Sequence, residues 1–109
     1  YDMIGMDYYY ADQDAQCPSD EDNAGAIRAL IDDGYLRRLL ISQDVFMKMM
    51  LTRHGGFGYG YILKHFLPRL RRHGVDRAAI DALMTEVLAV TGAFLEGDTA
   101  TVLRSLSRA

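Results

Sequence analysis

The sequence predicts an α/β fold, and three segments in a fixed order lead to this prediction. Residues 1–6, "YDMIGM", have the apolar composition of a short buried strand. Residues 19–33 carry apolar side chains at helical spacing, which predicts an amphipathic helix. Residues 36–42, "LRRLLIS", are apolar enough for a second strand that is buried on both faces. Strand, helix and strand in this order form a βαβ unit, with parallel strands and a right-handed crossover.

The ends of the first predicted helix carry the expected residues. Ser19 is a suitable N-cap, and the acidic side chains of Glu21 and Asp22 suit the positive end of the helix. Gly34 is a suitable residue at which the helix ends. The preceding segment, "DYYYADQDAQCPSD", is rich in Asp and ends near Pro18, so we expect a loop between the first strand and this helix.

The second half of the chain is predicted to be a loop followed by helices. Residues 45–60, here called the glycine-rich loop, contain glycines at positions 55, 56, 58 and 60. We expect a helix over 61–73 with a break near Leu67, because Pro68 lies inside it. Another helix is expected from an Asp76 N-cap to about Glu86, and a short one over 99–106.

Net charge and composition limit the kinds of partner that the chain is expected to bind. The formal net charge of −3 argues against nucleic acid, and no apolar run approaches the roughly 18 residues that a membrane helix needs. The single Cys17 has no partner for an internal disulfide, and a reducing, cytoplasmic location is the default expectation. Two parallel strands leave open edges, so we interpret residues 1–109 as an incomplete part of a larger α/β protein.

Asp44 follows the second predicted strand, in the stretch "LLISQDVF". Loops at the carboxyl ends of parallel strands are where the chemistry of α/β proteins is found. A carboxylate there can bind a divalent cation, with a distance to Zn²⁺ of about 2.0–2.2 Å. The same residue could instead cap the turn that follows. On the residues alone, both interpretations of Asp44 stay open.

Three segments together resemble the C-terminal part of the phosphotriesterase family of the amidohydrolase superfamily: "DMIGMDYYY", "LLISQDVF" and "HGGFGYGYILKHFLPRLRRHGV". The glycine-rich loop is most similar to the phosphotriesterase-related, resiniferatoxin-binding and phosphotriesterase homology branch. The resemblance covers roughly residues 1–86 and implies a TIM (β/α)8 barrel. Residues 1–6 would be its seventh strand, and residues 36–42 its eighth.

The resemblance also implies a metal centre, usually of two Zn²⁺ ions. The family's ligands are an H-x-H after the first strand, a carboxylated Lys or a Glu on the fourth, a His on the fifth and on the sixth, and an Asp ending the eighth. Asp44 matches the last of these, as metal ligand and catalytic proton shuttle, and the other ligands lie outside this segment. The rest of the barrel is therefore an expected partner, and a homodimer is one assembly that the barrel could form.

The implied reaction is attack by zinc-activated hydroxide on an ester-like bond, in a lactone or carboxylic ester, with phosphotriester as a further option. The isolated segment is expected to be inactive. The alternative is a non-catalytic protein that binds a small ligand on the same barrel. The sequence departs from the family at Glu86–Val87, where an N-P-x-R stretch usually follows.

The loops supply candidate substrate-binding residues. In the lactonase branch of the family, the loop after the seventh strand lends polar groups to the substrate, which points to Asp7, Tyr8 and Tyr9. A surface aromatic cluster is the alternative interpretation for these three. The glycine-rich loop could cover a pocket, which adds His54, Phe57 and Tyr59 as candidates, although a turn-rich loop of purely structural role would look the same.

Overall fold

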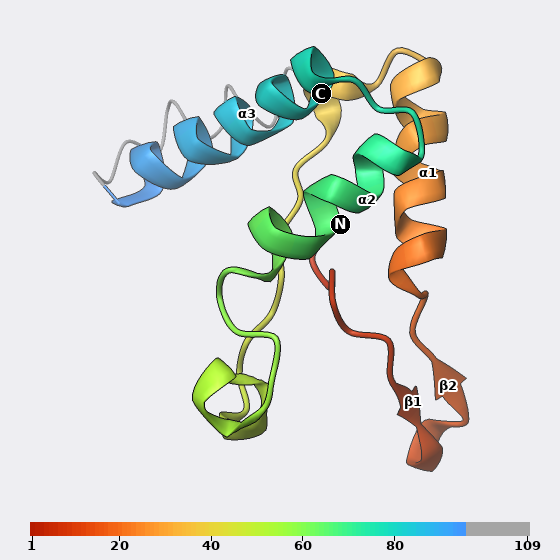
Figure 1. Cartoon of the computed structure of the whole chain (residues 1–109), viewed down its shortest axis with the longest axis vertical. Coiled ribbons are helices and arrows are strands. Elements are labelled where there is room, and N and C mark those ends of the chain that lie inside the picture. Colours follow the sequence, from red (N-terminus) through yellow and green to blue (C-terminus); the bar gives the residue numbers. More distant parts are fainter. Residues whose placement is uncertain (96–109) are drawn as a thin grey trace.

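A computed structural model describes residues 1–95, with side chains described for residues 1–89. Figure 1 shows three helices gathered at one end of the molecule, while a small hairpin and the glycine-rich loop extend from the other end. Residues 1–95 form an α/β segment of two short strands and three α-helices. These elements are β1 (Tyr9–Tyr10), β2 (Ala15–Gln16), α1 (Asp20–Asp32), α2 (Leu67–Arg72) and α3 (Arg77–Leu95).

The predicted positions of the strands are wrong. Within the described residues the only sheet is the antiparallel pair β1–β2, which lies inside the predicted loop. The first predicted strand is interrupted by a turn in which the Met6 amide donates to the Met3 carbonyl at 3.1 Å, and Gly5 takes a φ of +86°. The second begins as a 3-10 helix, Leu36–Arg38. Without a neighbouring strand on each side, neither segment has the ladder that keeps a central strand extended.

The two segments nevertheless lie side by side. The Tyr1 amino group donates to the Leu40 carbonyl at 3.0 Å, and the Tyr1 carbonyl accepts from the Ser42 amide at 2.8 Å. This pattern is that of one parallel bridge around Ile41. The Ile4 amide adds a bond to the Ser42 carbonyl at 3.3 Å. The polar side chains that follow these two segments therefore start from neighbouring positions.

Helix α1 forms as its end residues predict. Ser19 is the N-cap, and its hydroxyl accepts from the Asp22 amide at 3.1 Å. At the other end, Gly34 has a φ of +89°, and the Tyr35 amide donates to the Leu30 carbonyl at 2.9 Å. A glycine with positive φ followed by such a bond is a common way to end a helix, because it pairs carbonyls of the last turn.

The helix predicted over 61–73 changes type at the predicted break. A π-helical turn, Ile62–Phe66, leads into α2, which has Pro68 in its first turn. Proline has no amide hydrogen and its ring crowds the preceding turn, and the wider π-helical turn accommodates both effects.

The helix predicted from Asp76 to about Glu86 has the expected N-cap but not the expected end. The Asp76 carboxylate accepts from the Ala79 amide at 2.8 Å, as the N-cap prediction requires. The predicted end near Glu86 is wrong, because α3 continues to Leu95. No glycine or proline separates Arg77 from Thr91, so nothing in the sequence stops the helix at the Glu86–Val87 junction. The short helix predicted over 99–106 lies outside the described residues.

The core lies where the helices meet the two extended segments. Phe66, Ile27 and Leu83 are fully buried, and each contributes about 1.5–3 kcal/mol by removal of apolar surface from water. Ile4 and Ile41 join them from the segments predicted to be strands. Residues of the predicted strands therefore reach the core even though regular strands do not form. Within the described residues, no helix combines the length and apolar character needed to cross a bilayer.

Candidate functional site

Asp44 lies on an extended segment that leaves the core after Ile41. Its side chain is exposed and makes no hydrogen bond or ion pair with the described side chains. The turn-capping alternative therefore has no support in the described contacts, and the carboxylate is available to a ligand. Among the described residues, however, no group of three or more His, Cys, Asp or Glu side chains is arranged to hold a metal ion.

Gln43, the residue before Asp44, connects this segment to the end of the glycine-rich loop. Its side-chain Nε2 donates to the Gly58 carbonyl at 2.6 Å. Its Oε1 accepts from the Ile62 amide at 3.2 Å, which is one of the donors left unpaired at the start of a helix. One amide group thus holds both the loop and the beginning of the helix that follows it.

The glycine-rich loop is compact because its glycines allow backbone segments to approach closely. The Gly56 amide donates to the Leu51 carbonyl at 3.0 Å, and the Gly58 amide donates to the Met50 carbonyl at 2.8 Å. A Cβ at Gly56 would overlap the Met50 backbone, and one at Gly58 would overlap the Thr52 hydroxyl. Met50, which is 1% exposed, is enclosed by this fold of the loop.

A second connection, made by the buried Asp20, joins the two segments that carry predicted site residues. Asp20, the first residue of α1, is 8% exposed, and its Oδ1 accepts from the Gly5 amide at 2.9 Å. Its Oδ2 accepts a short hydrogen bond from the Tyr61 hydroxyl. Burial, and then the hydrogen bond to Asp20, raise the pKa of Tyr61 to about 12. The Tyr61 hydroxyl therefore stays protonated over the physiological range.

Asp7 lies beside this connection. It lines a polar pocket of about 300 Å³ together with Gly5, Ser19, Asp20, Glu21, Tyr61 and Arg69. The Glu21 carboxylate pairs with Arg69 and lies 2.7 Å from His73 Nε2. These contacts, the Arg69 bond first, lower the pKa of Glu21. Asp7 itself accepts from the Gln16 side chain at 2.8 Å, so part of its hydrogen-bonding capacity is already used.

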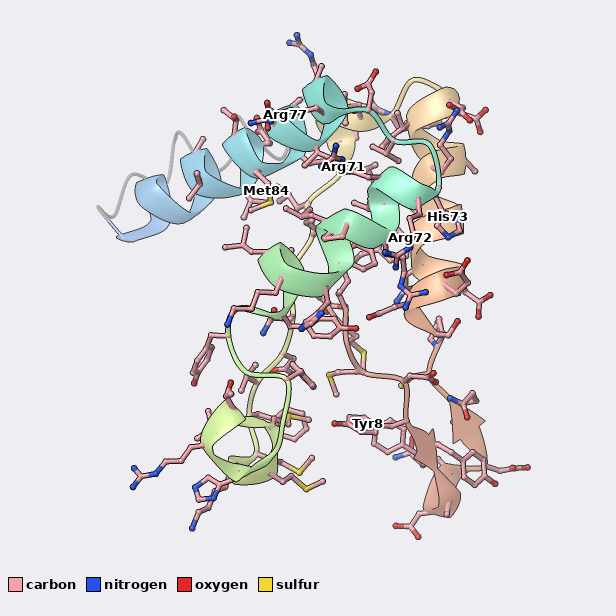
Figure 2. The ribbon with its side chains drawn as sticks, viewed as in Figure 1. Tyr8, Arg71, Arg72, His73, Arg77 and Met84 are labelled. Carbon is pink, nitrogen blue, oxygen red and sulfur yellow. The ribbon has the colours of Figure 1, made fainter. Side chains whose placement is uncertain are left out.

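The two tyrosines after Asp7 have different surroundings. The Tyr9 hydroxyl donates to Asp14 Oδ1 at 2.7 Å, a bond that raises the pKa of Tyr9. Tyr9 is thus held within its own hairpin. Tyr8 is half-buried and projects from the β1–β2 hairpin toward the side on which the glycine-rich loop lies (Figure 2). Of the two, Tyr8 is the better placed to contact a ligand.

The three candidates of the glycine-rich loop do not meet at one point. His54 lines an apolar hollow of about 420 Å³ with Met47, Lys48 and Met49. Phe57 instead packs edge-on against Tyr61, with ring centroids 5.2 Å apart. Tyr59 is 77% exposed. Within the described residues, no hydrogen bond or ion pair joins Asp44 to any of these side chains or to those of Asp7, Tyr8 and Tyr9.

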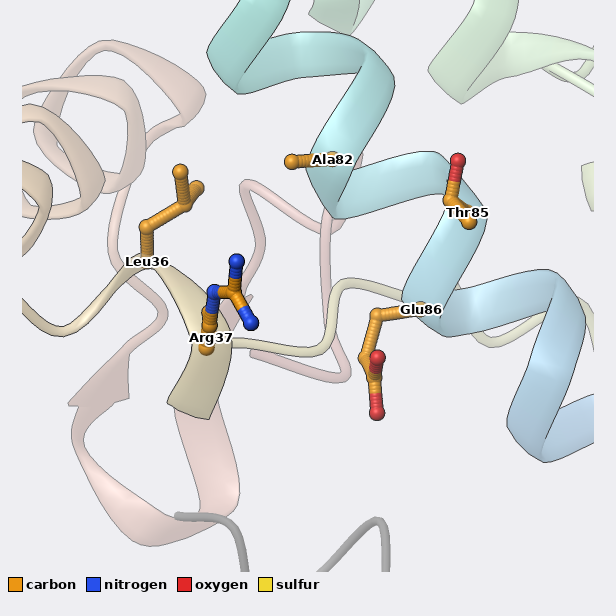
Figure 3. Close-up of a pocket in the computed structure, with 5 residues that line it drawn as sticks. All are labelled: Leu36, Arg37, Ala82, Thr85 and Glu86. Carbon is orange, nitrogen blue, oxygen red and sulfur yellow. The ribbon is translucent and has the colours of Figure 1, made fainter.

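A third pocket lies away from all seven predicted site residues. It has a volume of about 240 Å³ and is lined by Leu36, Arg37, Ala82, Thr85 and Glu86, between the 3-10 helix and α3 (Figure 3). One carboxylate oxygen of Glu86, Oε1, is buried without a hydrogen-bond partner in the described part of the chain. This oxygen lies at the junction where the sequence departs from the family pattern.

The hydrogen bonds that Gln43, Asp20 and Tyr61 make were not predicted. A sequence pattern shows which residues are polar at the ends of segments, but the partners here are 15 to 41 positions apart along the chain. The position of Gln43 beside Asp44 was the one available indication. Arg71 and Arg72 are exposed on α2 (Figure 2), whereas Arg69 is half-buried and pairs with Glu21.

Comparison with known proteins decides the family. The model of the phosphotriesterase family matches residues 1–88, which include Asp44 and both connections described above. The chain belongs to the phosphotriesterase family. The resemblance deduced from the three sequence segments is thereby confirmed.

Curated members of the phosphotriesterase family are similar along most of this chain. N-acetyltaurine hydrolase of Bos taurus is 33% identical over 88 residues, which are 79% of this chain and 25% of the relative. The phosphotriesterase homology protein of Escherichia coli (strain K12) is 35% identical over 86 residues, 79% of this chain and 27% of the relative. The chain thus spans about a quarter of the length of these relatives.

Two solved structures of phosphotriesterase-family proteins share the fold. A resiniferatoxin-binding protein from Rhodobacter sphaeroides superposes with a TM-score of 0.73 at 66% identity, over 76% of this chain and 23% of that chain. The Escherichia coli phosphotriesterase homology protein, solved with phosphate in its active site, gives a TM-score of 0.65 at 35% identity, over 76% of this chain and 26% of that chain. These family members are TIM barrels, and the α/β segment described here is similar to part of them.

Proposed function

We propose that this chain is the C-terminal segment, strands 7 and 8 with their helices, of a metal-dependent hydrolase barrel. The observation that carries the proposal is the family match over residues 1–88, within which Asp44 presents an exposed carboxylate without a described protein partner. The parallel bridge between Tyr1 and residues 40–42 fits neighbouring strands of a barrel. The remaining strands would supply the edges that this segment lacks.

Asp44 fits the role of one metal ligand. A carboxylate oxygen is a suitable donor for Zn²⁺, and this carboxylate is not engaged elsewhere in the described chain. One donor cannot hold a metal, so the other ligands must come from the rest of the barrel. When bound, zinc would supply a Lewis acid and lower the pKa of a bound water to about 7. Asp44 Oδ would accept the proton of the attacking nucleophile and pass it to the leaving group.

The substrate would be a small molecule with an ester-like or amide bond. A lactone or carboxylic ester is the class proposed from the sequence, with phosphotriesters as a further option. The names of the relatives add a second class, because N-acetyltaurine hydrolase acts on an N-acyl amide. Esters and amides both react at an acyl carbon, so the same carboxylate can assist either. Tyr8, half-buried and on the side of the glycine-rich loop, is the side chain proposed to contact the acyl substrate.

The alternative is a non-catalytic binding protein on the same barrel. It is favoured by the name of the 66% identical neighbour, a resiniferatoxin-binding protein. The discriminating residues lie outside this chain: an intact H-x-H and the two later His ligands favour the enzyme, and their loss favours binding alone.

The test uses the complete barrel that contains this chain, loaded with zinc. The protein is assayed against a lactone, a carboxylic ester, a phosphotriester and an N-acyl amide, alongside the Asp44→Asn variant. The proposal expects turnover of at least one ester or amide by the wild type and its loss in the variant. It also expects no turnover by the 109-residue chain alone. Zinc-independent turnover, or full activity of Asp44→Asn, would contradict the proposal.

A further inference from the structure

We propose that Gln43 is a positioning residue that sets the direction of the Asp44 carboxylate by clamping the end of the glycine-rich loop. The inference rests on the proposed function, in which Asp44 is a metal ligand. It adds to the proposed site a residue that acts through Asp44. It also explains why the end of the glycine-rich loop is held near position 43.

The geometry of the Gln43 side chain carries the inference. An amide has a donor end and an acceptor end, and here each meets its complement: Nε2 faces the Gly58 carbonyl at 2.6 Å, and Oε1 faces the Ile62 amide at 3.2 Å. Rotating the amide by half a turn would place donor against donor and acceptor against acceptor. The side chain is therefore fixed in one orientation by two bonds.

The clamp closes a loop of the chain. It joins position 43 to positions 58 and 62, so the glycine-rich loop is held at its exit as well as by the Gly56 and Gly58 amides. Ile62 is the first residue of the π-helical turn, whose amide would otherwise lack a partner inside the helix. A single substitution of Gln43 thus releases both the loop exit and the helix start.

The alternation of half-buried and exposed residues, which is typical of extended backbone, links Gln43 to Asp44. Burial alternates along the segment: Gln43 and Val45 are half-buried, whereas Asp44 and Phe46 are exposed. Successive side chains of extended backbone point to opposite sides. Because Gln43 is held on the inner side by two bonds, Asp44 is directed to the outer side. A shift of the backbone at position 43 would redirect the carboxylate.

The variants are chosen to separate the two bonds from overall stability. Gln43→Leu has similar bulk but neither donor nor acceptor. Gln43→Glu keeps the acceptor for the Ile62 amide, and it can donate to the Gly58 carbonyl only when it is protonated. Asp76→Ala is the matched control, because it also removes a hydrogen bond at a helix start, that to the Ala79 amide, but far along the chain from the loop.

Two measurements are made on the complete barrel that contains this chain. Hydrogen exchange of the Ile62 amide reports the clamp, and Zn²⁺ affinity together with the absorption spectrum of the Co²⁺-substituted protein reports the ligand geometry. We expect Gln43→Leu to accelerate exchange at Ile62, to lower Zn²⁺ affinity about 10–100-fold and to alter the Co²⁺ spectrum. Gln43→Glu should keep more protection at Ile62 than Gln43→Leu, because its carboxylate still accepts from that amide, and Asp76→Ala should leave all three readouts as in the wild type.

Each other result counts against a defined part of the proposal. Unchanged Ile62 exchange in Gln43→Leu overturns the clamp. Faster exchange with unchanged Zn²⁺ affinity and Co²⁺ spectrum overturns the positioning role, and so does an equal loss of affinity in Asp76→Ala. A wild type that binds no zinc overturns the proposed function and the positioning role with it, while the exchange data still show whether the clamp exists.

Discussion

The Tyr61 hydroxyl donates a hydrogen bond to the buried carboxylate of Asp20, 41 positions earlier in the chain. The same carboxylate accepts from the Gly5 amide at 2.9 Å. It therefore joins three segments: the turn that precedes Asp7 and Tyr8, the start of α1, and the start of the helix that follows the glycine-rich loop. Gln43 accepts a hydrogen bond from the amide of Ile62, the residue after Tyr61. Positions 61 and 62 therefore connect the segment that leads to Asp7 and Tyr8 with the segment that carries Asp44.

Tyr61 should make stability fall at alkaline pH. Its pKa is raised from 10.0 to about 12, so the fold favours the protonated hydroxyl. This contribution is fully present below pH 10.0 and is lost as the pH rises toward about 12. Denaturant titrations at several pH values should show a steeper alkaline loss in the wild type than in Tyr61→Phe. Tyr59→Phe, at a side chain that is 77% exposed, is the control and should behave as the wild type does.

Glu21 should make stability fall at acidic pH. Its pKa is lowered below the ordinary value of 4.5, chiefly by the bond from Arg69. The contribution is therefore present above pH 4.5 and is lost as the pH falls through the lowered pKa. In Glu21→Gln, the free energy of unfolding should fall less on acidification than it does in the wild type. Asp81→Asn, which removes an exposed pair to Arg77 with atoms 3.8 Å apart, should leave this fall unchanged, and an equal reduction of the fall in both variants would contradict the account.

The glycines of the glycine-rich loop should differ sharply from the glycine that ends α1. An alanine at Gly34 has open space around its Cβ, so only its φ of +89° is unfavourable, at about 1 kcal/mol. Gly56→Ala would overlap the Met50 backbone and should cost about 1–3 kcal/mol more. Unfolding free energies of the two variants test this order. Equal losses would mean that the close approach of Gly56 to Met50 is not present in solution.

Local features were predictable from the sequence because they depend on neighbouring residues. The Ser19 and Asp76 N-caps, the end of α1 at Gly34 and the break before Pro68 each follow from residues a few positions apart. The strands were not, because ladders on both sides keep a central strand extended, and among the described residues these two segments make ladder-like backbone bonds only to each other. Residues 9–16 instead pair with each other in a hairpin.

The candidate site also has one part that the sequence predicts and one part that it does not. Asp44 was identifiable because a polar residue after an apolar segment is visible in the sequence, and the structure leaves its carboxylate exposed. The hydrogen bonds of Asp20 and Gln43 join residues that are far apart along the chain, and no periodicity of the sequence predicts them. The grouping of Asp7, Tyr8 and Tyr9 with His54, Phe57 and Tyr59 remains a prediction, since the described contacts place these side chains in separate surroundings.

Zinc binding by the complete barrel, compared between wild type and Asp44→Asn, tests the central claim most directly. Asp44 is exposed and makes no hydrogen bond or ion pair within the described residues, so the variant should keep its stability within about 0.5 kcal/mol. The account predicts stoichiometric zinc in the wild type and a loss of at least about tenfold in affinity in the variant, with both proteins equally folded. Equal zinc affinity in the two proteins would show that Asp44 is not a ligand and would contradict the account.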